Sequence, residues 1–189
     1  MAIRKELDRR GFLRAGTGTA LFAGSAGLAI GAEEEELEEG ISPNEDLMRE
    51  HGVVLRVVTI HGEVLRRMRA EKGVPVEALS EATQLTRRFI EDYHEKLEEN
   101  HVFPWLERAG RLNDLVNTLK RQHAAGRKVT DRVMQLCDSG VAAGEESGRE
   151  LGRLLRAFSR MYLPHMGRED TVLFPAFRSL FTQESFMEM

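Results

Sequence analysis

His94-Glu-Lys-Leu-Glu98 and His165-Met-Gly-Arg-Glu169 are two copies of one short pattern, and Phe103-Pro104 and Phe174-Pro175 follow them at the same spacing. In each copy the carboxylate stands four residues after the imidazole, so on a helix both side chains leave the same face. Helical bundles build metal sites from such side chains on facing helices. The repeat therefore predicts a helical protein organised around a metal centre.

Composition agrees with a single soluble domain made of helices. The chain has 189 residues, of which 41% are hydrophobic, 31% charged and only 6% aromatic. Leu, Arg, Glu and Ala dominate, and these residues favour helices over strands. The formal charge is −4, and because residues 1–32 carry a net charge of +3, the remainder carries −7. This acidic body argues against nucleic acid as a partner.

Cys137 is the only cysteine. With a single cysteine, the chain can form neither an intramolecular disulfide nor a metal cluster held by several thiolates. Metal ligands in this chain must therefore be nitrogen and oxygen atoms.

The N-terminal 32 residues resemble a twin-arginine export signal. Arg9-Arg10 is followed by Phe12-Leu13-Arg14 and by an uncharged stretch rich in Gly, Ala and Thr, although Asp8 replaces the usual Ser or Thr. The resemblance implies export by the twin-arginine route to the periplasm or another extracytoplasmic location, with membrane contact only through this segment. An uncleaved N-terminal anchor is the alternative. Residues 33–43 then form an acidic linker, residues 44–181 the folded domain and residues 182–189 a frayed tail.

Four long helical patterns follow the linker, over about 45–72, 76–101, 112–137 and 148–181. The breaks contain Gly73-Val-Pro75, Pro104 with Gly110, and Ser139-Gly140, which are helix-ending residues. Because the connections are short, sequential helices should pack antiparallel. We expect an all-α fold, an up-down-up-down four-helix bundle.

One inward-facing histidine from each helix falls near the same level of this bundle. These are His51, His94, His123 and His165, and with Glu98 and Glu169 they make six nitrogen and oxygen ligands. That number suffices for two metal ions bridged by the two carboxylates. A single inward histidine is more often a core residue, but burying all six groups together without a cation would be costly.

These motifs resemble the hemerythrin-like (HHE) cation-binding domain over residues 44–181. The resemblance rests on Arg49-Glu-His51, His94-Glu-x-x-Glu98 with Phe103-Pro104, Gln122-His123-x-x-Gly126 and His165-x-x-x-Glu169-Asp170 with Phe174-Pro175. It implies a non-haem di-iron centre, with two iron ions joined by an oxo or hydroxo bridge and held by the six residues named above.

The chain departs from the oxygen carriers of that family at Arg127, where they have a second histidine one turn after the helix-three ligand. One metal should therefore lack a nitrogen ligand unless Glu95 or water replaces it. A more open metal pair favours reaction with dioxygen, peroxide or nitric oxide, as in oxidative stress, over reversible oxygen storage. The candidate activities are peroxidase, catalase-like or nitric-oxide-reducing. A non-enzymatic oxygen or iron sensor, or an iron-handling protein, is the alternative.

Several neighbouring residues compete for a place in the site. Asp170 competes with Glu169, but Glu169 continues the inward stripe of Tyr162, His165 and Val172. Glu95 is either solvated or a seventh ligand. His61 lies about 15 Å along its helix from His51, which favours a core or outer role. Gly126 makes room either for a small ligand or for close helix packing.

Overall fold

The computed structural model describes residues 41–139 and 144–188. Within these ranges the chain is helical and contains no strand, which confirms the all-α class. The predicted export signal and residues 33–40 of the predicted linker lie outside the described residues. In the part of the chain that is described, no helix is long and apolar enough to cross a membrane.

The helices follow the predicted patterns with shifted ends. The first is α2 (Pro43–Arg69). The second pattern is a continuous run of α3 (Val76–Leu85), a π-helical segment (Thr86–His94), α4 (Glu95–Leu97), a π turn (Glu98–Val102) and α5 (Phe103–Arg108). The third is α6 (Asn113–Asp138), and the fourth joins α7 (Glu145–Arg168), a π turn (Glu169–Leu173) and α8 (Phe174–Arg178). A short helix, α9 (Gln183–Met187), follows.

Local sequence explains where the first helix begins and where the first two helical runs end. Ser42 caps α2: its hydroxyl accepts from the Glu45 backbone N–H, and the Glu45 carboxylate accepts from the Ser42 N–H in return. Pro43 occupies the first turn, where its missing N–H costs nothing. Gly73 and Gly110, with φ of 72° and 66°, lie in the two connections that follow. Positive φ is easy for glycine, so the chain can leave each helix sharply there.

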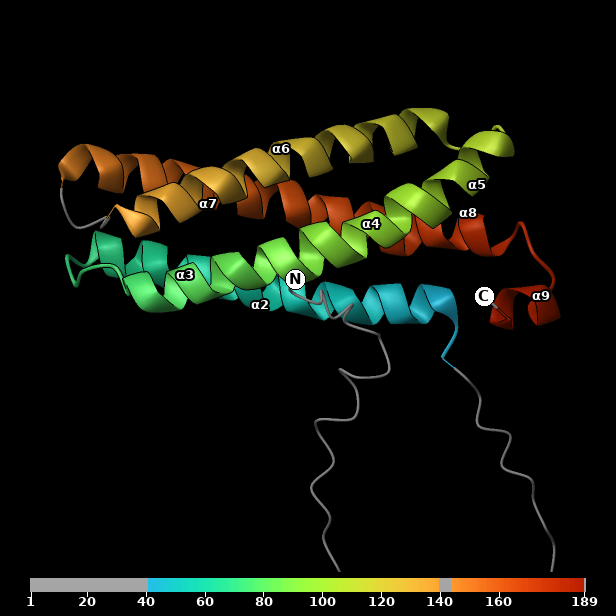
Figure 1. Ribbon diagram of the computed structural model, residues 1–189, viewed down its shortest axis with the longest axis horizontal. Coiled ribbons are helices and arrows are strands. Elements are labelled where there is room, and N and C mark those ends of the chain that lie inside the picture. Colours follow the sequence, from blue (N-terminus) through green and yellow to red (C-terminus); the bar gives the residue numbers. More distant parts are fainter. Residues whose placement is uncertain (1–40, 140–143, 189) are drawn as a thin grey trace, which may run out of the picture. The chain divides into compact units, whose positions relative to one another are not determined.

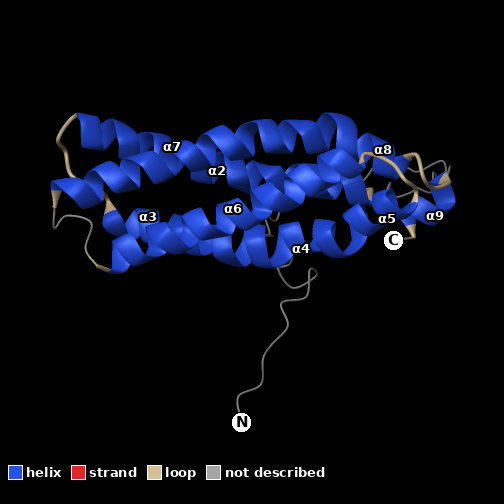
Figure 2. Ribbon diagram, turned by 90° about the horizontal axis from the view of Figure 1, so that it is seen from above, coloured by secondary structure: helices blue, strands red, loops and turns tan. Residues whose placement is uncertain are grey.

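The long helical runs lie side by side in a bundle (Figures 1 and 2). α2 packs against α3 and α7, and α6 packs against α3 and α7. Figure 1 shows α5, α8 and α9 gathered at one end, while the α2–α3 connection lies at the other. Residues far apart in the sequence therefore meet along the bundle interior.

Three apolar clusters fill that interior, and the histidine layer lies between two of them. The cluster at the α5–α8 end includes Leu47, Leu119 and Phe174, and the next cluster includes Val54, Ile90 and Tyr162. On α2, His51 lies between Leu47 and Val54. Apolar side chains above and below the layer exclude water, which strengthens electrostatic interactions within it.

The two Phe-Pro pairs explain the two π turns. A proline ring clashes with the carbonyl four residues earlier, so a helix that continues through proline must kink or widen. Here the turn before each pair widens: the Phe103 N–H bonds to the Glu98 carbonyl and the Phe174 N–H to the Glu169 carbonyl, five residues back. Residues five apart point about 140° apart on an α-helix but nearly share a face across a π turn. Both the glutamate and the phenylalanine of each repeat therefore face inward.

The structure differs from the sequence expectations at two places in the C-terminal part. Val172, expected on the inward stripe, is 43% exposed, whereas Leu173 is fully buried, because the π turn advances the register by one residue. The expected frayed tail contains α9, and Phe186 of that helix is fully buried against Phe177 and Phe181. Burial of one aromatic side chain is sufficient reason for this short helix to dock.

Candidate metal centre

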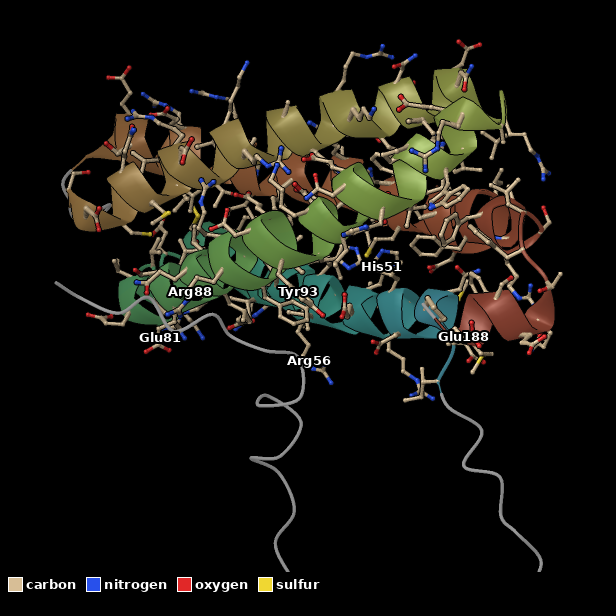
Figure 3. The ribbon with its side chains drawn as sticks, turned by 45° about the vertical axis from the view of Figure 1, so that its right-hand side comes forward. His51, Arg56, Glu81, Arg88, Tyr93 and Glu188 are labelled. Atoms are coloured by element: carbon tan, nitrogen blue, oxygen red, sulfur yellow. The ribbon has the colours of Figure 1, made fainter. Side chains whose placement is uncertain are left out.

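All six predicted ligand residues come together in the bundle interior. They leave between 0% and 4% of their surface exposed, and they are His51, His94, Glu98, His123, His165 and Glu169. Their ligand atoms form two overlapping groups within 4.8 Å, one of Glu98, His123, His165 and Glu169, the other of His51, His94 and Glu98. Figure 3 shows His51 directed into the bundle from α2, whereas Arg56 on the same helix projects outward.

The Nε2 atom of each imidazole faces a carboxylate. His165 and His51 approach Glu169 at 2.9 Å and 3.4 Å, and His123 and His94 approach Glu98 at 3.4 Å and 3.8 Å. Among the described residues, no group bonds to the oxygens of either glutamate in hydrogen-bond geometry. Four buried oxygens without such a bond, faced by four imidazole nitrogens, are donors of the kind that bind divalent cations.

The outer nitrogen of each imidazole is held by another side chain. His51 Nδ1 lies 2.8 Å from Asp170 Oδ1, and His94 Nδ1 lies 2.9 Å from Glu50 Oε2. His123 Nδ1 lies 3.1 Å from Glu99 Oε1, and His165 Nδ1 lies 2.9 Å from Gln122 Oε1. Such contacts fix the ring orientation and direct each Nε2 atom into the interior, where His123 Nε2 and His165 Nε2 lie 3.2 Å apart.

These outer partners were missed as site residues by the sequence reasoning, which considered Asp170 only as a competing ligand. Each is the chain neighbour of a predicted ligand: Glu50 of His51, Glu99 of Glu98, Gln122 of His123 and Asp170 of Glu169. Neighbours on a helix point about 100° apart, so each reaches a histidine on an adjacent helix. They could have been identified in the sequence as polar residues directly next to a predicted ligand.

The two phenylalanines of the Phe-Pro pairs cover the centre from one end. Phe103 stacks on His123 with ring centroids 5.6 Å apart, and Phe174 stacks on His51 at 5.8 Å. Both phenylalanines are fully buried. The repeated pattern thus supplies a histidine, a carboxylate and an aromatic cover from each half.

Imidazole and carboxylate groups inside the site stabilise each other's charged forms and shift each other's pKa. Burial lowers the pKa of His51, but Asp170 and Glu169 outweigh it and raise that pKa to about 9. Burial also opposes protonation of His123, yet Glu98 and Glu99 raise its pKa to about 10. Burial raises the pKa of Glu169, but His165 and His51 outweigh it and lower the pKa to about 2. A metal must displace the protons that balance these carboxylates.

Comparison with known proteins agrees with this geometry. The family model of the hemerythrin HHE cation binding domain matches residues 42–184. The chain belongs to this hemerythrin family. Uncharacterized proteins of Mycobacterium bovis and of two strains of Mycobacterium tuberculosis are 45% identical to it over 154 residues, which is 82% of this chain. The chain spans 60% of the length of these relatives. No solved structure matches it.

Arg127, which the family resemblance marks as a departure from the oxygen carriers, pairs with two glutamates of this hemerythrin domain. Its guanidinium forms an ion pair with Glu95 Oε2 at 2.6 Å and donates a hydrogen bond of 2.7 Å to Glu99 Oε1. The other oxygen of Glu95 accepts a hydrogen bond of 2.8 Å from the Tyr162 hydroxyl. Glu95 is only 1% exposed, so the suggestion that it is solvated is wrong, and both its oxygens have partners outside the six-residue set.

The remaining histidines of the hemerythrin domain lie apart from the centre. His61 is buried against Phe158 and lines a cavity of about 10 Å³ with Thr83, Thr86 and Thr130. Burial lowers its pKa to about 4, so it is neutral at pH 7. His101 is exposed. Neither joins a ligand group in the described part of the chain, which agrees with the core or outer role predicted for His61.

Proposed function

We propose that this chain is a non-haem di-iron protein whose helical runs form the up-down-up-down four-helix bundle of its family. His51, His94, His123, His165, Glu98 and Glu169 would hold two iron ions, with the glutamates between them. The observation that carries the proposal is the convergence of four anchored imidazoles on four buried carboxylate oxygens without hydrogen bonds. Imidazole and carboxylate ligands suit iron or manganese in such bundles.

We propose further that the centre reacts with dioxygen, peroxide or nitric oxide instead of storing oxygen. Arg127 supports this, because a guanidinium has no lone pair to give a metal and is tied to Glu95 and Glu99. Each metal would then receive two imidazoles, which leaves room for a small ligand. Bound iron would supply the redox chemistry, while the protein holds the ligand rings and excludes bulk water.

Metal content tests the first part. We expect about two iron atoms per chain after purification or anaerobic reconstitution, and a higher Tm than in metal-free protein. The variant His165→Ala should lose metal and most of this stabilisation, while the matched variant His101→Ala, at an exposed histidine, should keep both. Equal metal content in the two variants, or an unchanged Tm on loading, would refute the metal site.

Turnover tests the second part. Loaded protein should consume peroxide in steady state with a reductant present, and His165→Ala should abolish this consumption while His101→Ala retains it. Full metal content without consumption of any of the three oxidants would exclude the enzyme. It would favour a sensor or an iron-handling protein instead.

Export by the twin-arginine route is a separate proposal that rests on residues 1–32 alone. We expect the full chain to reach the periplasm or the extracytoplasmic face, and Arg9→Lys with Arg10→Lys to keep it in the cytoplasm. Cell fractionation checks this. Export that persists in the double variant would refute the route.

A further inference from the structure

Glu99, the side chain that contacts the outer nitrogen of His123, is itself held by two cations. Lys96 Nζ lies 2.5 Å from its Oε2 atom, and Arg127 donates a hydrogen bond of 2.7 Å to its Oε1 atom. The Lys96 side chain is 45% exposed, so its ion pair contributes little. The Arg127 side chain is 24% exposed and comes from α6, one turn beyond His123. Arg127 is therefore the stronger restraint on Glu99.

The same guanidinium nitrogen also holds a second carboxylate. Arg127 Nη2 lies 2.6 Å from Glu95 Oε2 as well as 2.7 Å from Glu99 Oε1. Glu95 and Glu99 lie one turn apart on the run from α4 into the following π turn, so their charges would repel each other without a cation between them. The other oxygen of Glu95 accepts the hydrogen bond from Tyr162. One guanidinium thus fixes two carboxylates of the second helical run against α6.

The predicted ligands divide into two metal positions. One combines the imidazoles of α6 and α7 with both glutamates; we call it the His123 position, and its members are Glu98, His123, His165 and Glu169. The other is the His51 position, with His51, His94 and Glu98. The two rings of each position are neighbours, with centroids 5.0 Å apart in the first and 4.9 Å apart in the second. Each position therefore takes its imidazoles from a different pair of helical runs.

The contacts of Arg127 lead to the His123 position. Through Glu99 they hold the His123 ring, whose Nδ1 atom lies 3.1 Å from the carboxylate. Through the other carboxylate they hold Tyr162, whose ring packs against that of His165 with centroids 5.5 Å apart. The outer partners of the His51 position come from α2 and from the π turn before α8. Arg127 thus supports one half of the centre.

We propose that Arg127 is a positioning residue for metal binding, which fixes the His123 ring through Glu99 and so strengthens binding at the His123 position and not at the His51 position. This inference rests on the proposed metal centre. A guanidinium has no lone pair for a metal, so its effect must pass through the side chains that it holds. Loss of such an outer contact weakens metal binding about 10–100-fold. Removal of Arg127 should therefore affect one of the two metals.

The variant Arg127→Gln tests the proposal in the full chain, because it keeps a polar side chain and removes the cation. Metal-free protein is titrated anaerobically with Fe²⁺, and binding is followed by calorimetry. Wild type should bind two ions; in Arg127→Gln one step should weaken about 10–100-fold while the other keeps its affinity. The matched control is Arg132→Gln, because Arg132 is also an α6 arginine paired with a glutamate of another helix. It should leave both steps unchanged.

Two further measurements separate positioning of the His123 ring from a general loss of structure. In metal-free protein, NMR should show faster solvent exchange of the His123 Nδ1 proton in Arg127→Gln, whereas the His51 Nδ1 proton should exchange as in wild type. Glu99→Ala should weaken the same binding step. Because both changes act through one contact, the double variant should lose less affinity than the product of the two single factors.

The variant Arg127→Lys keeps a cation and should retain part of the affinity that Arg127→Gln loses. If Arg127→Gln does not fold, Arg127→Lys gives the same comparison with a smaller expected factor. Wild-type affinity at both steps, or equal weakening of both, would overturn the role of Arg127 and leave the metal centre intact. Fully multiplicative losses with Glu99→Ala would overturn it too. No metal binding by the wild-type protein would refute the proposed function and this inference with it.

Discussion

The substitution Gly126→Ala should destabilise the protein although it improves helix propensity. Gly126 lies inside α6 and is buried. A Cβ atom there would lie 2.2 Å from the Tyr162 hydroxyl oxygen and 2.9 Å from Cζ of the same ring. Neither atom can easily move away, because the ring is 1% exposed and its hydroxyl bonds to Glu95.

The size of the effect follows from three contributions. Alanine in place of glycine gains about 1 kcal/mol in a helix interior. Overpacking of a core costs about 1–3 kcal/mol. Displacing the hydroxyl leaves a buried carboxylate oxygen without its donor, which costs about 1–3 kcal/mol more. We expect a net loss of about 3 kcal/mol in the free energy of unfolding.

Urea unfolding of metal-free protein measures this loss. Gly62→Ala is the matched control, because its Cβ would meet no atom within 4 Å and it should gain about 1 kcal/mol. Tyr162→Phe removes the nearest atom, so the double variant Gly126→Ala with Tyr162→Phe should lose less than the two single losses added together. A Gly126→Ala protein as stable as wild type, or additive losses in the double variant, would show that the contact does not control this position.

Three further predictions concern stability. Burial lowers the pKa of His61 to about 4, so its contribution to the free energy of unfolding is complete above pH 6.5 and is lost as the pH falls through 4. In urea titrations, His61→Leu should therefore lose up to about 3 kcal/mol less stability than wild type over this pH range. Glu91 should show the opposite pH dependence, since burial raises its pKa, which gives stability that is present below about pH 4.5 and lost as the pH rises through 7. The free energy of unfolding of Glu91→Gln should therefore rise by about 2 kcal/mol relative to wild type between pH 4.5 and 8. A difference between the two proteins that does not change with pH would contradict this. Ser42→Ala should cost about 1 kcal/mol at any pH by removing the cap of α2, whereas an unchanged midpoint would mean that the cap is not needed.

Local patterns in the sequence predicted the helices well because helix formation depends on residues three and four apart. The ranges expected around 45–72 and 112–137 lie within three residues of α2 and α6 at each end. The same short-range rule placed His94 with Glu98 and His165 with Glu169. Cap and turn residues such as Ser42 and Gly73 act locally too.

The predictions that went wrong depend on features that no single helix face shows. Val172 looked inward because the pattern assumed 3.6 residues per turn, and the π turn before Phe174-Pro175 changes that number. Glu95 looked solvated because it is charged, whereas Arg127 and Tyr162 from two other helices surround it.

The chemistry of the site was therefore determined by the sequence, and its environment was decided by the tertiary structure. Two His-x-x-x-Glu repeats with one histidine from each remaining helix define which atoms can bind metal, since spacing along a helix fixes the shared face. The anchoring of the four rings by Glu50, Glu99, Gln122 and Asp170 depends on how the helices are rotated and aligned against one another. That alignment results from packing of all the apolar faces at once, so it is not contained in any one stretch of the chain.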